Sequence, residues 1–115
     1  MEQSQYDGMM KELADTERKF HCGCEQVVAL TLRLSEMQNR YEWAKAMNRP
    51  TSRDFFRDRI KIIEGVKSMY FTYAVYQAEN LERLQQEIYG RVLVDSNDVY
   101  ILVHYDRYRN VRQNN

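Results

Sequence analysis

The first half of the chain carries an apolar stripe that repeats alternately every three and four residues. The stripe begins at Tyr6 and ends at Ala44, and its only members that are not apolar, Thr16 and Gly23, are small. This spacing keeps one face of an α-helix apolar over about eleven turns. A 3.5-residue repeat is typical of a helix that winds along another helix. The stripe therefore predicts a long helix, at about residues 5–47, with a helical partner.

One helix-stopping signal follows this stripe. The single proline of the chain, Pro50, cannot continue a preceding helix, and it disfavours helical geometry in the residue before it. Thr51 then fits the N-cap of a second helix, with Asp54 three residues later in a position like that of a capping box. Because the connection is short, we expect the two helices to be antiparallel neighbours.

The second helix is predicted at about residues 52–89. Its apolar ridge begins at Phe56 and ends at Ile88, and Gly90 is a plausible stop. Residues 69–76 are rich in types that favour β-strands. We still expect a helix there, because the flanking residues keep a helical period and no turn signal separates them from this segment.

The C-terminal residues 91–115 have a different character. Two runs that favour strands, 91–94 and 99–105, flank a turn-rich connection, which predicts a short β-hairpin. A third helix at about residues 97–112 is the alternative, because Ile101, Tyr105, Tyr108 and Arg112 share a helical face. The expected fold is mainly α, with one domain over residues 1–115 built on a long, coiled-coil-like antiparallel helical hairpin.

The apolar side chains outnumber the positions of one narrow seam between two helices. A second copy of the chain would cover the surplus and give a four-helix bundle with two-fold symmetry, although a different helical protein would satisfy the same surface. Eight of these side chains cannot all face one narrow seam, namely Phe20, Val28, Leu32, Trp43, Phe71, Tyr73, Val75 and Tyr76. The residues expected at helix–helix interfaces are Phe20, Val27, Leu30, Leu34, Met37, Tyr41, Ile60, Ile63, Tyr70, Tyr73, Leu81 and Leu84.

A basic cluster lies at the predicted tip of the hairpin. Its members are Arg49, Arg53, Arg57, Arg59 and Lys61. Near a helix N-terminus such a cluster could bind phosphate on a nucleic acid or on a membrane surface. Asp54 and Asp58 interleave with these side chains, however, and the whole chain is neutral, with seventeen basic and seventeen acidic residues. Ordinary pairing along the helix is therefore the favoured interpretation, and anion binding is the alternative.

The two cysteines and a nearby histidine are the only candidates for a metal site. Imidazole and thiolate groups bind zinc, and His21 and Cys24 share a helical face with Glu17 and Glu25. Cys22 lies about 200° around the axis from Cys24, so a four-ligand site would need residues from elsewhere. A disulfide across one residue would be strained. We therefore expect two small apolar thiols and a surface histidine, with no metal and no cofactor.

The chain contains no glycine-rich phosphate loop, no paired CxxC, no HExxH and no GxSxG motif. This absence favours a protein that is not an enzyme. The sequence predicts a protein–protein interaction or scaffold protein that associates with itself through amphipathic helices. It has no apolar N-terminal leader and no run of about 18 apolar residues, so we expect an intracellular protein, cytoplasmic or nuclear.

Overall fold

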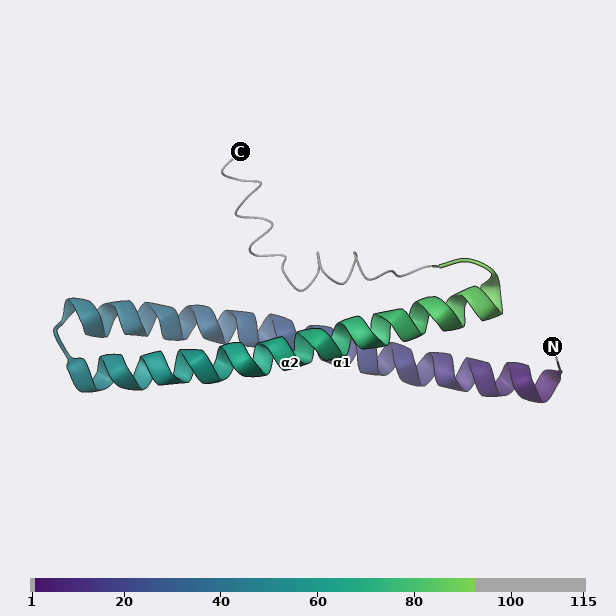
Figure 1. Ribbon diagram of the computed structural model, residues 1–115, viewed down its shortest axis with the longest axis horizontal. Coiled ribbons are helices and arrows are strands. Elements are labelled where there is room, and N and C mark those ends of the chain that lie inside the picture. Colours follow the sequence, from purple (N-terminus) through teal and green to yellow (C-terminus); the bar gives the residue numbers. More distant parts are fainter. Residues whose placement is uncertain (1, 93–115) are drawn as a thin grey trace, which may run out of the picture.

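Residues 2–92 are described by the computed structural model, and they form two long helices joined at one end (Figure 1). Helix α1 spans Gln3–Ala46 and helix α2 spans Pro50–Tyr89. The two run antiparallel and pack along each other, and no strand occurs within the described part of the chain. The predicted mainly α fold and helical hairpin are confirmed. The predicted β-hairpin or third helix falls almost entirely on residues 93–115, outside the described residues.

Both helices end close to the predicted positions. Helix α1 begins about two residues earlier than expected, where the backbone N–H of Glu2 donates to Oε1 of Gln5 at 3.4 Å. Helix α2 ends at Tyr89, and Gly90 follows in the left-handed conformation with φ 71°. A glycine adopts this φ without a steric penalty, which explains the stop. Residues 69–76 are helical, as predicted.

The tip of the hairpin differs from the prediction in how α2 begins. Pro50 is the first residue of the helix, and Arg49, not Thr51, occupies the N-cap position. Proline is favoured there because the first helical N–H groups have no partner within the helix, so its missing donor is not needed. The chain reverses at Asn48, which has φ 55°, and the N–H of Arg49 donates to the carbonyl oxygen of Ala44 at 2.9 Å.

The best-packed part of the seam lies away from the tip. Large apolar side chains of α1, among them Phe20 and Val27, pack there with Leu81 and Leu84 of α2. The cluster of buried residues comprises Leu13, Phe20, Cys24, Val27, Ala74, Ala78, Leu81 and Leu84. Toward the tip, Met37, Ala44 and Ile63 are buried, whereas several of their neighbours are only half-buried. The hydrophobic core is therefore concentrated in the N-terminal half of α1 and the C-terminal half of α2.

Two small residues of the α1 stripe are also buried in this seam. Helix α1 continues through Gly23, which lies against Ala74 of α2. Thr16 is buried with its hydroxyl donating to the carbonyl oxygen of Glu12 at 2.8 Å, so its polar group is satisfied inside the helix. Near the open end, Arg83 of α2 pairs with Glu12 of α1 at 3.2 Å. Neither α1 nor α2 has an apolar stretch long enough to cross a bilayer.

Candidate functional site

Most of the predicted interface residues lie in the contact between α1 and α2 of one hairpin. Six are buried, namely Phe20, Val27, Met37, Ile63, Leu81 and Leu84. Five are half-buried, namely Leu30, Leu34, Tyr41, Ile60 and Tyr70. Tyr73 is the exposed member of the set. The seam within one chain therefore uses most of these side chains, and a contact of theirs with another chain stays a prediction.

A different set of large apolar side chains stays exposed on α2. Phe55, Ile62, Met69 and Tyr76 follow one another at seven-residue intervals, with 52%, 57%, 73% and 59% of their surface exposed. Seven residues are close to two turns, so these four side chains lie on one side of the helix. Val66 and Tyr73 fall between them at the alternating three- and four-residue spacing. We call these six residues the α2 strip.

A groove runs beside the tip half of the α2 strip. Its volume is about 240 Å³, and its α2 wall includes Phe55 and Ile62. The α1 wall carries Arg33 and Arg40 on either side of Met37. A second depression further along α2 is lined by Val66, Met69, Tyr70 and Tyr73. The same face of the hairpin thus has an apolar edge on α2 and a basic edge on α1.

Sequence reasoning missed part of the α2 strip. Tyr73 and Tyr76 were recognised as surplus to one seam, but Phe55, Ile62 and Met69 were not. The signal is present in the sequence, because a second three-four repeat runs parallel to the ridge that begins at Phe56. A charged residue, Arg59, interrupts this second repeat, which hides it from a search for continuous apolar faces.

Exposed apolar side chains on α1 are more scattered. Val28, Leu32, Trp43 and Met47 are all exposed, as expected for Val28, Leu32 and Trp43 from the surplus over one seam. Trp43 is covered in part, since the guanidinium carbon of Arg49 lies 5.5 Å from the centre of its ring. These four residues are spaced four, eleven and four positions apart along α1. They therefore form no continuous strip like that of α2.

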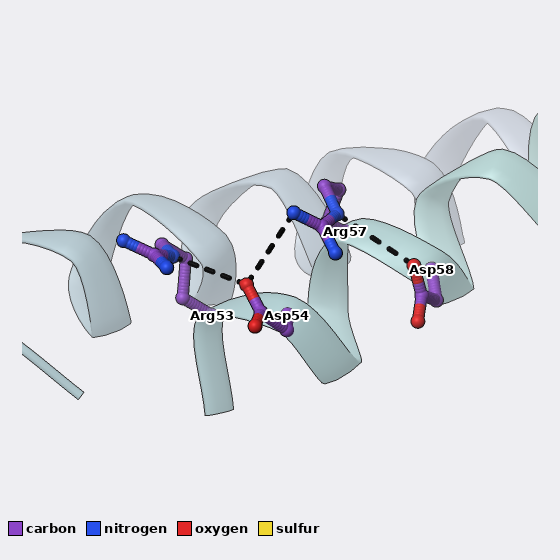
Figure 2. A network of polar contacts seen from close by, with 4 residues as sticks. All are labelled: Arg53, Asp54, Arg57 and Asp58. Atoms are coloured by element: carbon purple, nitrogen blue, oxygen red, sulfur yellow. Dashed lines mark hydrogen bonds and ion pairs between the residues drawn. The ribbon is translucent and has the colours of Figure 1, made fainter. Parts of the chain in front are cut away.

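Two members of the predicted basic cluster, Arg53 and Arg57, lie beside carboxylates at the start of α2 (Figure 2). Arg53 Nε lies 3.3 Å from Oδ1 of Asp54, and a terminal nitrogen of Arg57 lies 3.4 Å from the same oxygen. Nε of Arg57 also lies 3.6 Å from Oδ1 of Asp58. The predicted pairing of these arginines along the helix is confirmed. Each pair is half-exposed, so its contribution to stability is at most about 1 kcal/mol.

The other arginines of this cluster lie over aromatic rings. Arg49 lies over Trp43, and the guanidinium carbon of Arg59 is 5.3 Å from the centre of the Phe55 ring. Cation–π contacts of this kind hold a guanidinium against an apolar surface without neutralising it. Lys61 is exposed on α2. The tip therefore presents a mixture of positive, negative and aromatic groups, which differs from a uniformly basic patch.

The cysteine and histidine candidates are separated by the geometry of α1. Cys24 is buried in the seam, whereas Cys22 and His21 are exposed. Burial raises the pKa of the Cys24 thiol, and the negative charge of Glu25 adds to the increase. Within residues 2–92, no three side chains of His, Cys, Asp or Glu come together as a potential metal site. Cys24 is therefore a packing residue whose thiol is kept protonated.

The geometry of the hairpin thus offers two surfaces for function, the α2 strip with its groove and the mixed cluster at the tip. Comparisons of the chain with protein-family models, with curated proteins and with solved structures found no match.

Proposed function

We propose that this chain is a non-enzymatic protein–protein interaction or scaffold protein that associates with itself through its amphipathic helices. The observation that carries the proposal is the α2 strip, four of whose six side chains are more than half exposed. Full burial of a large apolar side chain that starts fully exposed contributes about 1.5–3 kcal/mol, and these four side chains would each gain roughly half of that on being covered. Contiguous apolar surface of this kind is typical of interaction sites.

The form of the strip favours a helical partner. From Phe55 to Tyr76 its repeat positions alternate at intervals of three and four residues over 22 positions of α2, and Arg59 is the one charged residue among them. A partner helix can insert its own side chains between those of such a strip along its whole length. Two hairpins joined in this way form a four-helix arrangement, which is the common way for helical hairpins to share a core.

Anion binding through the tip is the weaker alternative. Three arginine–carboxylate contacts among Arg53, Asp54, Arg57 and Asp58 reduce the positive potential that would attract a phosphate. The chain as a whole carries no net charge, so no long-range field would guide a polyanion to this site. No contact at the tip favours this function over a structural role.

The solution mass of the purified chain tests the proposal. We expect light scattering behind a sizing column to show a dimer or a larger assembly over a wide range of concentration. The double variant Ile62→Lys with Met69→Lys should be monomeric with unchanged helix content, because two charges in the strip oppose burial. Leu32→Lys changes an equally exposed position of α1 and should keep the wild-type mass. A wild-type monomer at every concentration would overturn the proposal.

A further inference from the structure

We propose that two copies of the chain pair through their α2 strips in antiparallel orientation, with the two-fold axis passing near Val66. This inference rests on the proposed self-association and adds the surface, the orientation and the register. It concerns the exposed strip, which is distinct from the buried seam between α1 and α2 of each hairpin.

Four of the six members of the strip are placed symmetrically about its middle. Ile62 and Met69 lie at equal distances on either side of a point between Gly65 and Val66, and so do Phe55 and Tyr76. In an antiparallel two-fold pair, the first half of one strip lies beside the second half of the other, because each residue before the axis comes level with one after it in the other copy. Each aromatic end of one strip then lies within about one turn of the aromatic end of the other. The strip is thus complementary to itself in this orientation.

The charge within the strip distinguishes the antiparallel from the parallel orientation. Arg59 is the only charged residue at the repeat positions between Phe55 and Tyr76. In a parallel pair in register, Arg59 would face its own copy, which is repulsive. In the antiparallel pair it comes close to Tyr73 of the second copy, whose ring can receive a guanidinium as the Phe55 ring does within the hairpin.

The flank of the strip that points away from α1 also fits the antiparallel pair. Thr51, Asp58, Gly65, Thr72 and Glu79 follow one another there at seven-residue intervals. Pairing about the middle of the strip brings Asp58 level with a threonine and Glu79 level with Thr51, so no like charges oppose each other. A methyl group added to Gly65 would meet no atom within 4 Å in the hairpin. The open space at Gly65 allows a second helix to approach closely near the axis.

The surface available is close to that of a stable interface. The six side chains of the strip expose on the order of 600 Å² per copy, given the size of aromatic and aliphatic side chains, against about 800 Å² per partner in a typical specific complex. The α1 edge of the same face is basic through Arg33 and Arg40. Like charges on the two α1 edges favour a contact made mainly by α2.

Cross-linking between cysteines placed on the flank tests the orientation. Thr51→Cys and Glu79→Cys are each introduced into a background of Cys22→Ser with Cys24→Ala, and both sites are exposed. In the antiparallel pair, position 51 of one copy lies within about one turn of position 79 of the other. Two copies of the same position lie more than about 30 Å apart along the helices. A thiol-to-thiol linker with a span of about two helical turns can join position 51 of one copy to position 79 of the other. It cannot join two copies of the same position.

The expected result is a cross-linked dimer only when the two variants are mixed and allowed to exchange. Light scattering of the background and of each variant must first show the wild-type mass. A dimer in which each variant alone cross-links to itself would establish a parallel pair and overturn this inference. A dimer that yields no cross-link in the mixture would also overturn it, while leaving the proposed self-association intact. A wild-type monomer overturns both.

Discussion

Gly23 of α1 and Ala74 of α2 lie so close that a methyl group on Gly23 would come within 3.3 Å of the Ala74 Cβ and within 3.4 Å of its Cα. The same methyl group would lie 3.1 Å from Cδ1 of Tyr73. Neither the Cα nor the Cβ of Ala74 can move without moving the backbone of α2. The separation of the two helices at this level is therefore set by the absence of a side chain at Gly23.

Enlarging Gly23 should destabilise the hairpin. We expect Gly23→Leu to lower the free energy of unfolding by about 1–3 kcal/mol, because the added side chain forces α1 and α2 apart where they pack best. Chemical denaturation followed by circular dichroism measures this change. Gly8→Ala is the matched control, since a methyl group there meets no atom within 4 Å, and it should raise stability by up to about 1 kcal/mol through helix propensity. If Gly23→Ala raised the free energy of unfolding as much as Gly8→Ala does, the close approach of Gly23 to Ala74 would be contradicted.

The uneven burial along the seam predicts where truncation has the largest effect. Leu81 is 1% exposed in the apolar cluster. We expect Leu81→Ala to lower the free energy of unfolding by about 2–5 kcal/mol, because it removes buried methyl groups and leaves a cavity. Leu32→Ala makes the same change at an exposed position and should alter stability by less than about 0.5 kcal/mol. Denaturant titration of both variants measures the difference, and similar effects would show that the two leucines are equally buried.

The spacing of apolar residues and one proline were sufficient to predict the hairpin. The stripe from Tyr6 to Ala44 identifies the face of α1 that meets α2, and Pro50 marks the reversal of the chain. Both features are local in sequence, and helix formation and helix stops depend mainly on local spacing. The predicted start of α2, at about residue 52, lies after the observed start at Pro50. The difference arises because proline both ends a preceding helix and favours the first position of a new one. Sequence alone does not decide between these two roles.

The candidate surface was harder to predict, for a physical reason. Helix α2 carries two overlapping apolar repeats, one through Ile63 and Leu81 and one through Ile62 and Met69. Which repeat faces α1 depends on how each helix is oriented about its own axis in the packed hairpin. The contact between Gly23 and α2 contributes to that rotation, and it joins residues about 50 positions apart. A helical period identifies apolar faces but does not identify which face the intramolecular partner covers.

The burial of Cys24 predicts a specific dependence of stability on pH. Because the pKa of its thiol is raised in the folded state, the folded protein binds this proton more tightly than the unfolded chain does. The corresponding stability is fully present below the ordinary thiol pKa of about 8.5 and is lost as pH rises through the raised value. Compared with Cys24→Ala, the wild type should therefore lose more stability as the pH rises above the ordinary thiol pKa.

Denaturation of both proteins across this pH range measures the effect, and the comparison cancels the contributions of the groups that the two proteins share. Cys22→Ala is the control, because it removes an exposed thiol from the same helix. Thiol alkylation gives a second readout. At neutral pH the exposed Cys22 should react first, and Cys24 should react only on the timescale on which the hairpin opens. Equal rates for the two thiols would contradict the burial of Cys24.

The pairing at the tip predicts that two aspartates suppress the binding of anions. Asp54 and Asp58 contact Arg53 and Arg57, so Asp54→Asn with Asp58→Asn should leave two arginines free to bind phosphate. We expect fluorescence anisotropy with a labelled single-stranded RNA to show weak binding by the wild type at about 0.15 M salt. The variant should bind more tightly, and its affinity should fall steeply as salt rises. Glu17→Gln with Glu36→Gln removes the same charge from exposed positions of α1 and should leave binding weak. Tight, salt-sensitive binding by the wild type itself would show that the basic cluster acts despite its carboxylates, and would favour the anion-binding alternative.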